Sequence, residues 1–278
     1  MSDVPKEGGI GLVWLDGELL DPSDALVPYD DHGVTVGDGA FETVKVSSGQ
    51  PFFLDSHLIR LDRSLRALRL RPVEHRVLQQ ASAVVCESFG GDGFLRITVT
   101  AGRGPLGSPR DDVEPTVIVA IRPGEVRVDP TAVITVPFTR NERGALAGVK
   151  STSYAENVIA LDLAVSQGAT EAVFANTQGL LCEGTGSNVF VVVDDVLVTP
   201  TLAAGCLDGI TRALLLDLLP DAVEEDVPIE ALAEAPEAFL VSTGREVQPI
   251  SQVDGRPLPS APGPHTERAR AAWLAAFG

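Results

Sequence analysis

The most reactive candidate group in this sequence is the amine of Lys150. Of the 21 lysines and arginines, three are lysines, which makes an essential amine easy to look for. Lys150 follows the small and apolar residues 144–149 and precedes residues 151–157, which are mostly polar. Loss of solvation lowers the pKa of an amine and makes it nucleophilic, as imine chemistry requires. The alternative is a surface lysine at the end of a loop.

Three further segments carry polar groups among small residues. Glu183 begins the small-residue loop 183–190, Ile210 and Thr211 open a helix after a glycine, and Thr243 follows a strand. The backbone N–H groups at the start of a helix bind anions, and neighbouring hydroxyls add donors. An amine, an acid and an anion site are what pyridoxal 5'-phosphate requires. The amine forms the imine, the acid keeps the pyridine nitrogen protonated, and the anion site holds the phosphate.

Composition excludes several other classes of function. The chain has 278 residues, a net charge of −18 and a pI of about 4.5, which argues against nucleic acid and anionic membranes as partners. No apolar run is long enough to span a bilayer, and the N-terminus lacks the pattern of a signal peptide. Three widely spaced cysteines fit a reducing compartment, and the four histidines lack the spacing of metal ligands. We therefore expect a cytoplasmic protein without a metal.

The elements that must position these groups mix strands and helices. In the first half, residues 12–15 and 18–20 predict a hairpin around Asp16-Gly17, and a second hairpin is expected from residues 41–46 and 51–54. Asp55 is expected to cap a helix with leucines on one face. The remaining elements of this half are a helix over 74–88 and strands over 94–100 and 116–121.

The second half has the same mixed character. Helices are expected over 154–167, 209–218 and 266–277, and strands over 132–136, 172–175, 188–193, 196–199 and 238–242. The proline- and glycine-containing stretch 123–130 predicts a linker between an N-terminal α+β domain, 1–122, and a C-terminal cofactor-binding domain, 131–278. Hairpins without regular βαβ alternation argue against a doubly wound parallel sheet. The expected class is therefore α/β in the mixed, α+β sense.

Two motifs in the first half resemble a known family. Residues 37–46, Gly-Asp-Gly-Ala-Phe-Glu-Thr-Val-Lys-Val, and residues 57–61, His-Leu-Ile-Arg-Leu, are similar to motifs of the class IV, or fold type IV, pyridoxal phosphate enzymes. These include branched-chain aminotransferases, D-amino acid transaminases, R-selective amine transaminases and 4-amino-4-deoxychorismate lyases. The resemblance runs from Trp14 to about Pro249. It implies a two-domain fold with pyridoxal phosphate in the interdomain cleft, usually in a homodimer.

The resemblance also assigns roles to individual residues. It implies that Lys150 is the Schiff-base lysine and that Glu183 faces the pyridine nitrogen of the cofactor. The residues that it places around the phosphate are Arg60, Ile210, Thr211 and Thr243.

Several roles stay open from the sequence. Tyr154 either contacts the phenolic oxygen of the cofactor or is structural, because branched-chain enzymes carry their tyrosine one residue later, where this chain has Ala155. Phe41 either lines the substrate side or belongs to the core. His57 is expected to be a structural helix residue. Composition alone would place Arg60 on the surface, together with the other arginines of its helix.

Two reactions compete. A transaminase moves an amino group from an amino acid, with a D-amino acid favoured, or from an R-amine to a keto acid, whereas a lyase expels pyruvate from aminodeoxychorismate. Residues 183–190 and 209–212 resemble the transaminases, and residues 146–150 resemble the lyases; we favour the transaminase. D-amino acid transaminases hold the substrate carboxylate with a tyrosine, an arginine and a histidine. Here Phe41 replaces the tyrosine and Asp112 the histidine, so Arg110, helped by Arg103, is the expected cation.

Overall fold

The computed structural model describes residues 11–278, which form two compact units. Unit 1 comprises the described residues up to Glu125 together with Val149–Ser153, and unit 2 comprises Val126–Gly148 and Tyr154–Gly278. The expected boundaries at residues 122 and 131 stay a prediction. The segment with Lys150 belongs by its packing to unit 1, although we expected it in the C-terminal domain.

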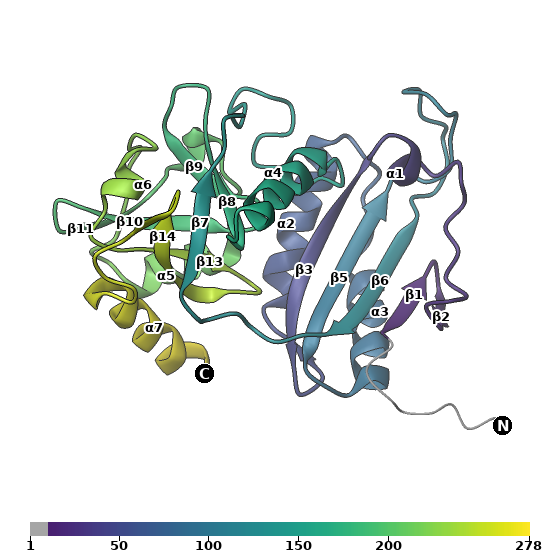
Figure 1. Ribbon diagram of the computed structural model, residues 1–278. Helices are drawn as coiled ribbons and strands as arrows, with labels where there is room; N and C mark the ends of the chain where they lie inside the picture. The colour runs from purple at the N-terminus through teal and green to yellow at the C-terminus, as the bar shows by residue number, and fades with distance from the viewer. Residues whose placement is uncertain (1–10) are drawn as a thin grey trace. The chain divides into compact units, whose positions relative to one another are not determined.

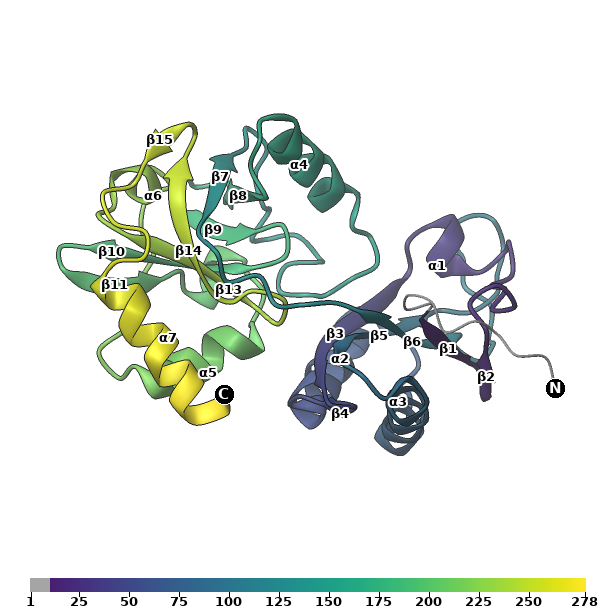
Figure 2. The same ribbon diagram turned by 60° about the horizontal axis from the view of Figure 1, so that its bottom comes forward.

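Unit 1 is a six-stranded sheet with two long helices on one face (Figures 1 and 2). The strand order is β2-β1-β6-β5-β3-β4, and every neighbouring pair is antiparallel. The strands are β1 (Leu12–Leu15), β2 (Glu18–Leu20), β3 (Gly39–Ser47), β4 (Gln50–Pro51), β5 (Gly93–Thr100) and β6 (Val117–Pro123). The helices are α1 (His32–Thr35), α2 (Leu54–Ala67) and α3 (His75–Phe89).

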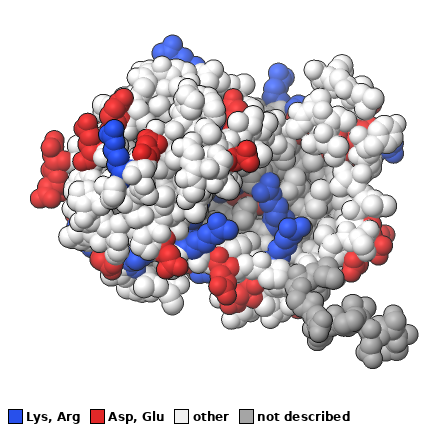
Figure 3. All heavy atoms as spheres, viewed as in Figure 1, with Lys and Arg blue, Asp and Glu red and all other residues white. Residues whose placement is uncertain are grey.

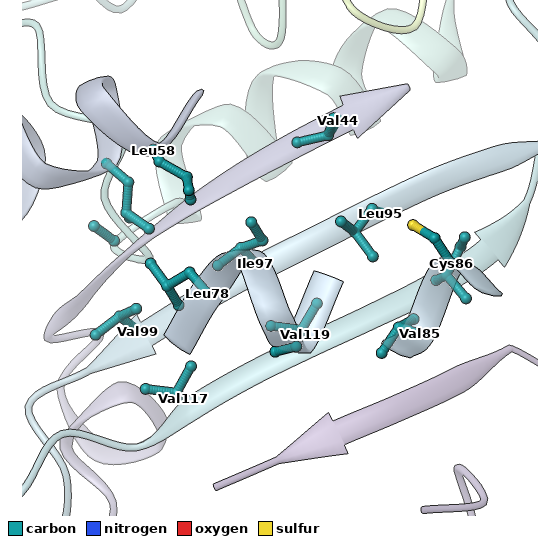
Figure 4. Packing of buried hydrophobic residues seen from close by; sticks show 14 of the residues in the cluster. Val44, Leu58, Leu78, Val85, Cys86, Leu95, Ile97, Val99, Val117 and Val119 are labelled. Atoms are coloured by element: carbon teal, nitrogen blue, oxygen red, sulfur yellow. The ribbon is translucent and has the colours of Figure 1, made fainter. Parts of the chain in front are cut away.

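The core of unit 1 lies between this sheet and α2 and α3. Alternate residues of the strands point towards the helices, among them Val44, Leu95 and Ile97, and meet Leu58 and Leu78 (Figure 4). Such two-residue alternation leaves every second side chain on the opposite face of the sheet. Phe41 of β3 and Arg96 of β5 lie on that opposite face.

The segment Val149–Ser153 is held against the start of β3. The Lys150 carbonyl accepts a hydrogen bond from the Phe41 N–H at 2.9 Å, and the Thr152 N–H donates to the Gly39 carbonyl at 2.8 Å. The hydroxyls of Thr152 and Ser153 both donate to the Gly37 carbonyl at 2.8 Å. These bonds fix the backbone of Lys150 beside the Gly-Asp-Gly motif.

Unit 2 is built on a nine-stranded sheet in the order β12-β11-β10-β13-β14-β7-β8-β9, with β15 beside β14. Its strands are β7 (Thr131–Thr135), β8 (Glu171–Ala175), β9 (Leu181–Gly184), β10 (Asn188–Val193), β11 (Val196–Thr199), β12 (Val223–Glu224), β13 (Ala238–Ser242), β14 (Glu246–Val253) and β15 (Arg256–Pro257). Its helices are α4 (Ala155–Ser166), the 3₁₀ helix η1 (Leu202–Ala204), α5 (Ile210–Leu218), α6 (Ala231–Glu234) and α7 (Pro264–Phe277).

The helices of unit 2 pack through small and apolar residues. Ala160 and Ala164 of α4 pack against Ile134, Ala172 and Phe174 of β7 and β8. Helices α5 and α7 lie side by side in both ribbon views (Figures 1 and 2). The strands β7 and β8, which α4 connects along the chain, form a parallel pair, whereas β8 and β9 form an antiparallel pair.

Most of the expected elements are confirmed, some at their exact bounds and the others with shifts of one or two residues at their ends. Three details were wrong. Asp55 does not cap α2, because Phe53 is the N-cap residue and the Asp55 carboxylate accepts a bond from Gln79 instead. The strand expected over 51–54 ends at Pro51. Glu183 lies on the strand β9 and not in a loop, and neither β9 nor β14 was expected.

On the face shown in Figure 3, acidic side chains lie at many separate places and do not form one patch. None of the helices in residues 11–278 is long and apolar enough to cross a bilayer.

Candidate active site

Lys150 and Phe41 form the centre of the candidate site in unit 1. The Nζ atom of Lys150 lies 4.4 Å from the centroid of the Phe41 ring, which is buried with 2% exposure. Phe41 is thus both a buried residue and a direct neighbour of the lysine, so neither of its two sequence interpretations excludes the other. The contact keeps the half-buried amine beside an aromatic face.

Arg96 adds a second cation at the same ring. Its guanidinium carbon lies 3.3 Å from the Phe41 centroid, although β5 and the Lys150 segment are far apart in the sequence. The side chain of Arg96 is exposed, whereas its strand neighbours Leu95 and Ile97 are fully buried. Sequence analysis missed Arg96, but the alternation of β5 could have placed it on the face of Phe41.

Arg60 lies in the interior of unit 1 beside Glu42. Its exposure is 6%, so the surface position that composition alone suggests is wrong. The Glu42 carboxylate accepts bonds from Arg60 Nε at 2.8 Å and from Arg60 Nη2 at 2.7 Å, so the pair is bidentate. His57 Nδ1 lies 2.7 Å from Glu42 Oε2, one turn before Arg60 on α2. His57 is thereby held as a buried helix residue.

The pKa values in this cluster follow from burial and charge. Burial acts to raise the pKa of Glu42, but the bonds and charges of Arg60 and His57 outweigh it and lower the pKa to about 2. Burial lowers the pKa of His57, and the positive charges of Arg60 and Lys150 lower it further against the opposing effect of Glu42. Glu42 is therefore an anion over the physiological range and compensates the charge of Arg60.

Glu183 is the central acid of unit 2. Its Oε1 atom lies 3.2 Å from Arg140 Nε, and its Oε2 atom accepts the Leu207 N–H at 2.9 Å. The side chain is 14% exposed, and the guanidinium of Arg140 packs 4.1 Å from the centroid of the buried Phe174 ring. One ion pair and one backbone hydrogen bond thus orient a largely buried carboxylate at the end of β9. Sequence analysis missed Arg140.

The segment that leads into α5 is connected to Glu183 by Leu207, whose N–H binds the Glu183 carboxylate. The Asn188 amide donates to the Leu207 carbonyl at 2.8 Å. Gly209 is the N-cap of α5, and a Cβ atom there would lie 1.9 Å from Asn188 Oδ1, so this position requires glycine. Ile210 and Thr211 follow as the first helical residues, whose N–H groups have no acceptor within the helix.

Tyr154 is bound to the turn after β9. Its hydroxyl donates to the Thr185 carbonyl at 2.6 Å, and the Asn157 amide donates to the same oxygen at 2.5 Å. The sequence left the role of Tyr154 open, and this bond supports the structural interpretation. Thr243 lies in the turn that connects β13 and β14, which the Arg245 N–H closes by a 3.1 Å bond to the Ser242 carbonyl.

Arg103 and Arg110, the expected substrate cations, both bind carboxylates of their own unit. Arg103 pairs with Asp30 at 2.9 Å, and Arg110 donates two 2.6 Å bonds to Asp38. Arg110 also donates to the carbonyls at the end of α2. Asp112 is exposed and pairs with Arg71. Both arginines are therefore paired with carboxylates of unit 1, and their role toward substrate stays a prediction.

The structure thus gathers the predicted residues into two groups. Phe41, Arg60 and Lys150 belong to unit 1. The residues in unit 2 are Tyr154, Glu183, Ile210, Thr211 and Thr243. Their roles toward a cofactor stay predictions, and each unit contributes part of the expected set.

Comparison with known proteins gives the family. Residues 39–253 match the model of the amino-transferase class IV family. A putative branched-chain-amino-acid aminotransferase of Methanocaldococcus jannaschii is 34% identical over 257 residues, covering 88% of each chain. A D-alanine aminotransferase of Bacillus licheniformis is 30% identical and covers 94% of this chain and 95% of its own. An aminodeoxychorismate lyase of Bacillus subtilis is 27% identical and covers 87% of each.

Solved structures agree with this match. The branched-chain aminotransferase of Thermoproteus uzoniensis with norvaline has a TM-score of 0.87 and 29% identity, and covers 95% of this chain and 94% of its own. A hypothetical aminotransferase of Mycobacterium tuberculosis in its PLP-bound form has a TM-score of 0.83 and 29% identity, and covers 95% and 99%. The mixed α/β fold is that of fold type IV aminotransferases. The chain belongs to the class IV aminotransferases, enzymes that use pyridoxal phosphate.

Proposed function

We propose that this protein is a transaminase that binds pyridoxal phosphate and moves an amino group between a small amino donor and a keto acid. The observation that carries the proposal is the arrangement at Lys150. Its backbone is bonded to β3, and its amine lies over the buried ring of Phe41. A fixed, half-buried amine suits a nucleophile that must be deprotonated to react.

The donor set of unit 2 fits the cofactor. Glu183 is an acid held by Arg140 and the Leu207 N–H, which suits a charge-assisted bond to a protonated pyridine nitrogen. The start of α5 offers N–H groups and the Thr211 hydroxyl, and Thr243 offers a further hydroxyl. Phosphate and pyridine groups would thus both find suitable partners, and Arg60 of unit 1 is the proposed arginine for the phosphate.

Bound pyridoxal phosphate supplies an electron sink for the pair of electrons left when the α-proton of the donor departs. In the proposed reaction Lys150 would take the proton from the donor α-carbon and deliver it to the cofactor. Glu183 would keep the pyridine nitrogen of the bound cofactor protonated. The second half of the cycle repeats these steps in reverse with the keto acid.

Arg96 is the proposed partner for a substrate carboxylate. Its guanidinium contacts the same Phe41 ring as the Lys150 amine. If Arg96 binds the carboxylate, its replacement by alanine should raise the Michaelis constant for D-alanine about tenfold or more. The same change should leave R-1-phenylethylamine, which lacks a carboxylate, nearly unaffected. Equal losses for both donors would exclude this role.

The experiment that tests the proposal is a panel of amino donors assayed with 2-oxoglutarate and with pyruvate as acceptors. The panel includes D- and L-amino acids and R-amines, and Lys150→Ala is the control. Amino transfer that depends on Lys150 is the expected result. If no donor is consumed by the wild-type protein loaded with cofactor, the transaminase proposal is wrong.

The second candidate is a 4-amino-4-deoxychorismate lyase. The similarity to the Bacillus subtilis lyase and the lyase-like residues 146–150 favour it. The same panel separates the two reactions when aminodeoxychorismate is included. Release of pyruvate and 4-aminobenzoate without transamination of any donor would establish the lyase.

We also propose a homodimer in the cytoplasm. The exposed side of α4 carries Val158, Ile159 and Val165, each about 60% exposed, which is unusual for an isolated surface. A second copy of the chain is the proposed cover for this side of α4. The cytoplasm is proposed because all three cysteines are buried and free, as in reducing compartments. Light scattering should give twice the mass of 29.2 kDa. A monomer at micromolar concentration would contradict the dimer.

A further inference from the structure

A buried carboxylate, Glu171, lies between two turns of unit 2, one that follows Glu183 and one that carries Thr243. It is the first residue of β8 and is 1% exposed. Neither the sequence motifs nor the proposed chemistry gives it a role. A buried carboxylate is costly unless it is fully hydrogen-bonded, so its partners indicate what it is for.

On one side Glu171 holds the turn that follows Glu183. Its Oε1 atom accepts the Thr185 N–H at 3.0 Å and also the Thr185 hydroxyl. Its Oε2 atom accepts the Ser187 hydroxyl at 2.8 Å. A Cβ atom at Gly184 would lie 2.4 Å from Ser187 Oγ and 3.0 Å from the Glu171 carboxyl carbon, so glycine is what lets this turn close over the carboxylate.

On the other side Glu171 faces the turn that carries Thr243. Arg245 Nη2 lies 3.4 Å from Glu171 Oε2, and the same nitrogen donates to the Thr170 carbonyl at 2.9 Å. The Arg245 side chain is 11% exposed and also bonds Gln248. Because the Arg245 N–H closes the turn to Ser242, fixing its guanidinium also fixes the backbone around Thr243.

We propose that Glu171 is a positioning residue that sets the distance between the Gly184–Ser187 turn and the Ser242–Arg245 turn, and thereby between Glu183 and Thr243. The inference rests on the proposed function, in which Glu183 meets the pyridine end of the cofactor and Thr243 the phosphate end. Glu171 itself contacts neither end. It acts through Thr185 and Ser187 on one side and through Arg245 on the other.

The test compares Glu171→Gln and Arg245→Met with a matched control, Glu237→Gln. Glu237 is also a buried carboxylate of unit 2, and it accepts two backbone N–H groups and the Thr266 hydroxyl. These bonds lie at the start of α7, away from both turns. The control therefore loses similar bonds without touching the proposed spacing. Affinities of the apoprotein for pyridoxal phosphate and for pyridoxal, which lacks the phosphate, are measured by absorbance titration.

Glu171→Gln should weaken the binding of both ligands by about tenfold or more, because both turns shift. Arg245→Met should weaken pyridoxal phosphate alone, because it holds the phosphate-side turn. Glu237→Gln should keep both affinities within about threefold of wild type at a similar loss of thermal stability. Wild-type affinities in the Glu171 variant, or equal losses in the Glu237 control, would overturn the inference.

Hydrogen exchange of the apoprotein gives a readout that needs no cofactor. Amides of residues 184–187 and 242–245 should exchange faster in Glu171→Gln than in wild type, whereas those near Thr266 should not. Glu171→Asp, which keeps the charge, serves if the glutamine variant fails to fold. Failure of wild type to bind pyridoxal phosphate would instead reject the proposed function. Unchanged exchange in both turns would reject the role of Glu171 on its own.

Discussion

Each of the two units holds a fully buried carboxylate beside an arginine, Glu42 in unit 1 and Glu171 in unit 2, but they compensate the carboxylate in different ways. In unit 1, Glu42 receives its bonds from charged or titratable side chains, with both bonds of Arg60 at 2.8 Å or less. In unit 2, Glu171 is bonded mainly by hydroxyls and backbone N–H groups, and Arg245 lies 3.4 Å away. The first carboxylate depends on its arginine, whereas the second organises the turns around it.

This difference suggests a division of tasks. The Glu42 carboxylate allows a guanidinium with five N–H donors to be buried, because it neutralises the charge while using two of the donors. The Glu171 carboxylate instead gives a glycine-containing turn a defined shape. We infer that removing the arginine has a larger effect on stability in unit 1 than in unit 2.

The largest expected effect tests that inference directly. Arg60→Met should destabilise unit 1 by about 3–5 kcal/mol, because it leaves a buried, uncompensated Glu42. Arg245→Met should destabilise unit 2 by about 1–2 kcal/mol, because Glu171 keeps its other donors. Urea denaturation can follow each unit separately, since Trp14 lies in unit 1 and Trp273 in unit 2. Each remaining tryptophan reports on its own unit when the other is changed to phenylalanine.

A double variant provides the control for this prediction. Glu42→Leu combined with Arg60→Met removes both charges and should recover most of the stability lost in Arg60→Met alone. A double variant as unstable as Arg60→Met would mean that lost packing, and not the stranded carboxylate, causes the effect. Equal losses in the two units would end the contrast between the pairs.

The pH dependence of stability should also differ between wild type and Glu42→Gln. The folded state lowers the pKa of Glu42 from 4.5 to about 2, so its contribution is present above pH 4.5 and is lost as the pH falls towards 2. A shift of this size corresponds to about 3 kcal/mol. Denaturation midpoints between pH 7 and pH 3 should therefore fall less steeply in Glu42→Gln, although that variant starts from a lower value at pH 7.

Glu142 serves as the control for the acid limb. Its side chain is 4% exposed, and bonds from Thr177 lower its pKa to about 2 as well. Glu142→Gln should keep the steep acid limb of unit 1, because Glu142 belongs to unit 2. If Glu42→Gln and wild type lose stability in parallel, Glu42 is not the ion that the contacts indicate.

Much of unit 1 follows from its sequence, and less of unit 2 does. The strands and long helices of unit 1 were expected nearly as they occur, and the alternation of Ala40, Glu42, Val44 and Val46 could have placed Glu42 on the side of α2. His57 and Arg60 share a buried face of that helix at a spacing of three residues. The pairing was missed because their arginine-rich helix resembles a surface helix.

The contacts of Glu171 could not be predicted in this way. Its partners come from turns after β9 and β13, and no periodic pattern connects residues so distant in the chain. The strand β9 was missed because Glu183 and Gly184 interrupt its apolar run. Glu183 itself was singled out by its motif, whereas Arg140, its ion-pair partner, carries no local signal.

Glu183 extends the comparison to a carboxylate that is largely but not fully buried, with 14% exposure. Glu183→Gln should retain pyridoxal phosphate but slow the chemical step about a hundredfold, because the amide cannot stabilise a protonated pyridine nitrogen as an anion does. Single-turnover kinetics with a saturating donor measure this step. A variant with wild-type rates would show that Glu183 does not tune the cofactor, and loss of the cofactor would show that it mainly holds it.

The smallest expected effect concerns the exposed pair Arg110–Asp38 of unit 1. Its bonds are as short as those of Arg60, but the Arg110 side chain is 37% exposed. Arg110→Ala should cost less than about 1 kcal/mol, because water replaces the lost bonds. Urea denaturation reported by Trp14 measures it. A loss as large as that of Arg60→Met would mean that burial does not explain the strength of the first pair.

The most direct test of the account as a whole is to locate the residue that binds the cofactor covalently. The protein loaded with pyridoxal phosphate is reduced with borohydride and digested, and the labelled peptide is identified by mass spectrometry. The account predicts a label on Lys150, and no label in Lys150→Ala. A label on Lys45, whose amine lies over Phe52 and not over Phe41, would contradict it.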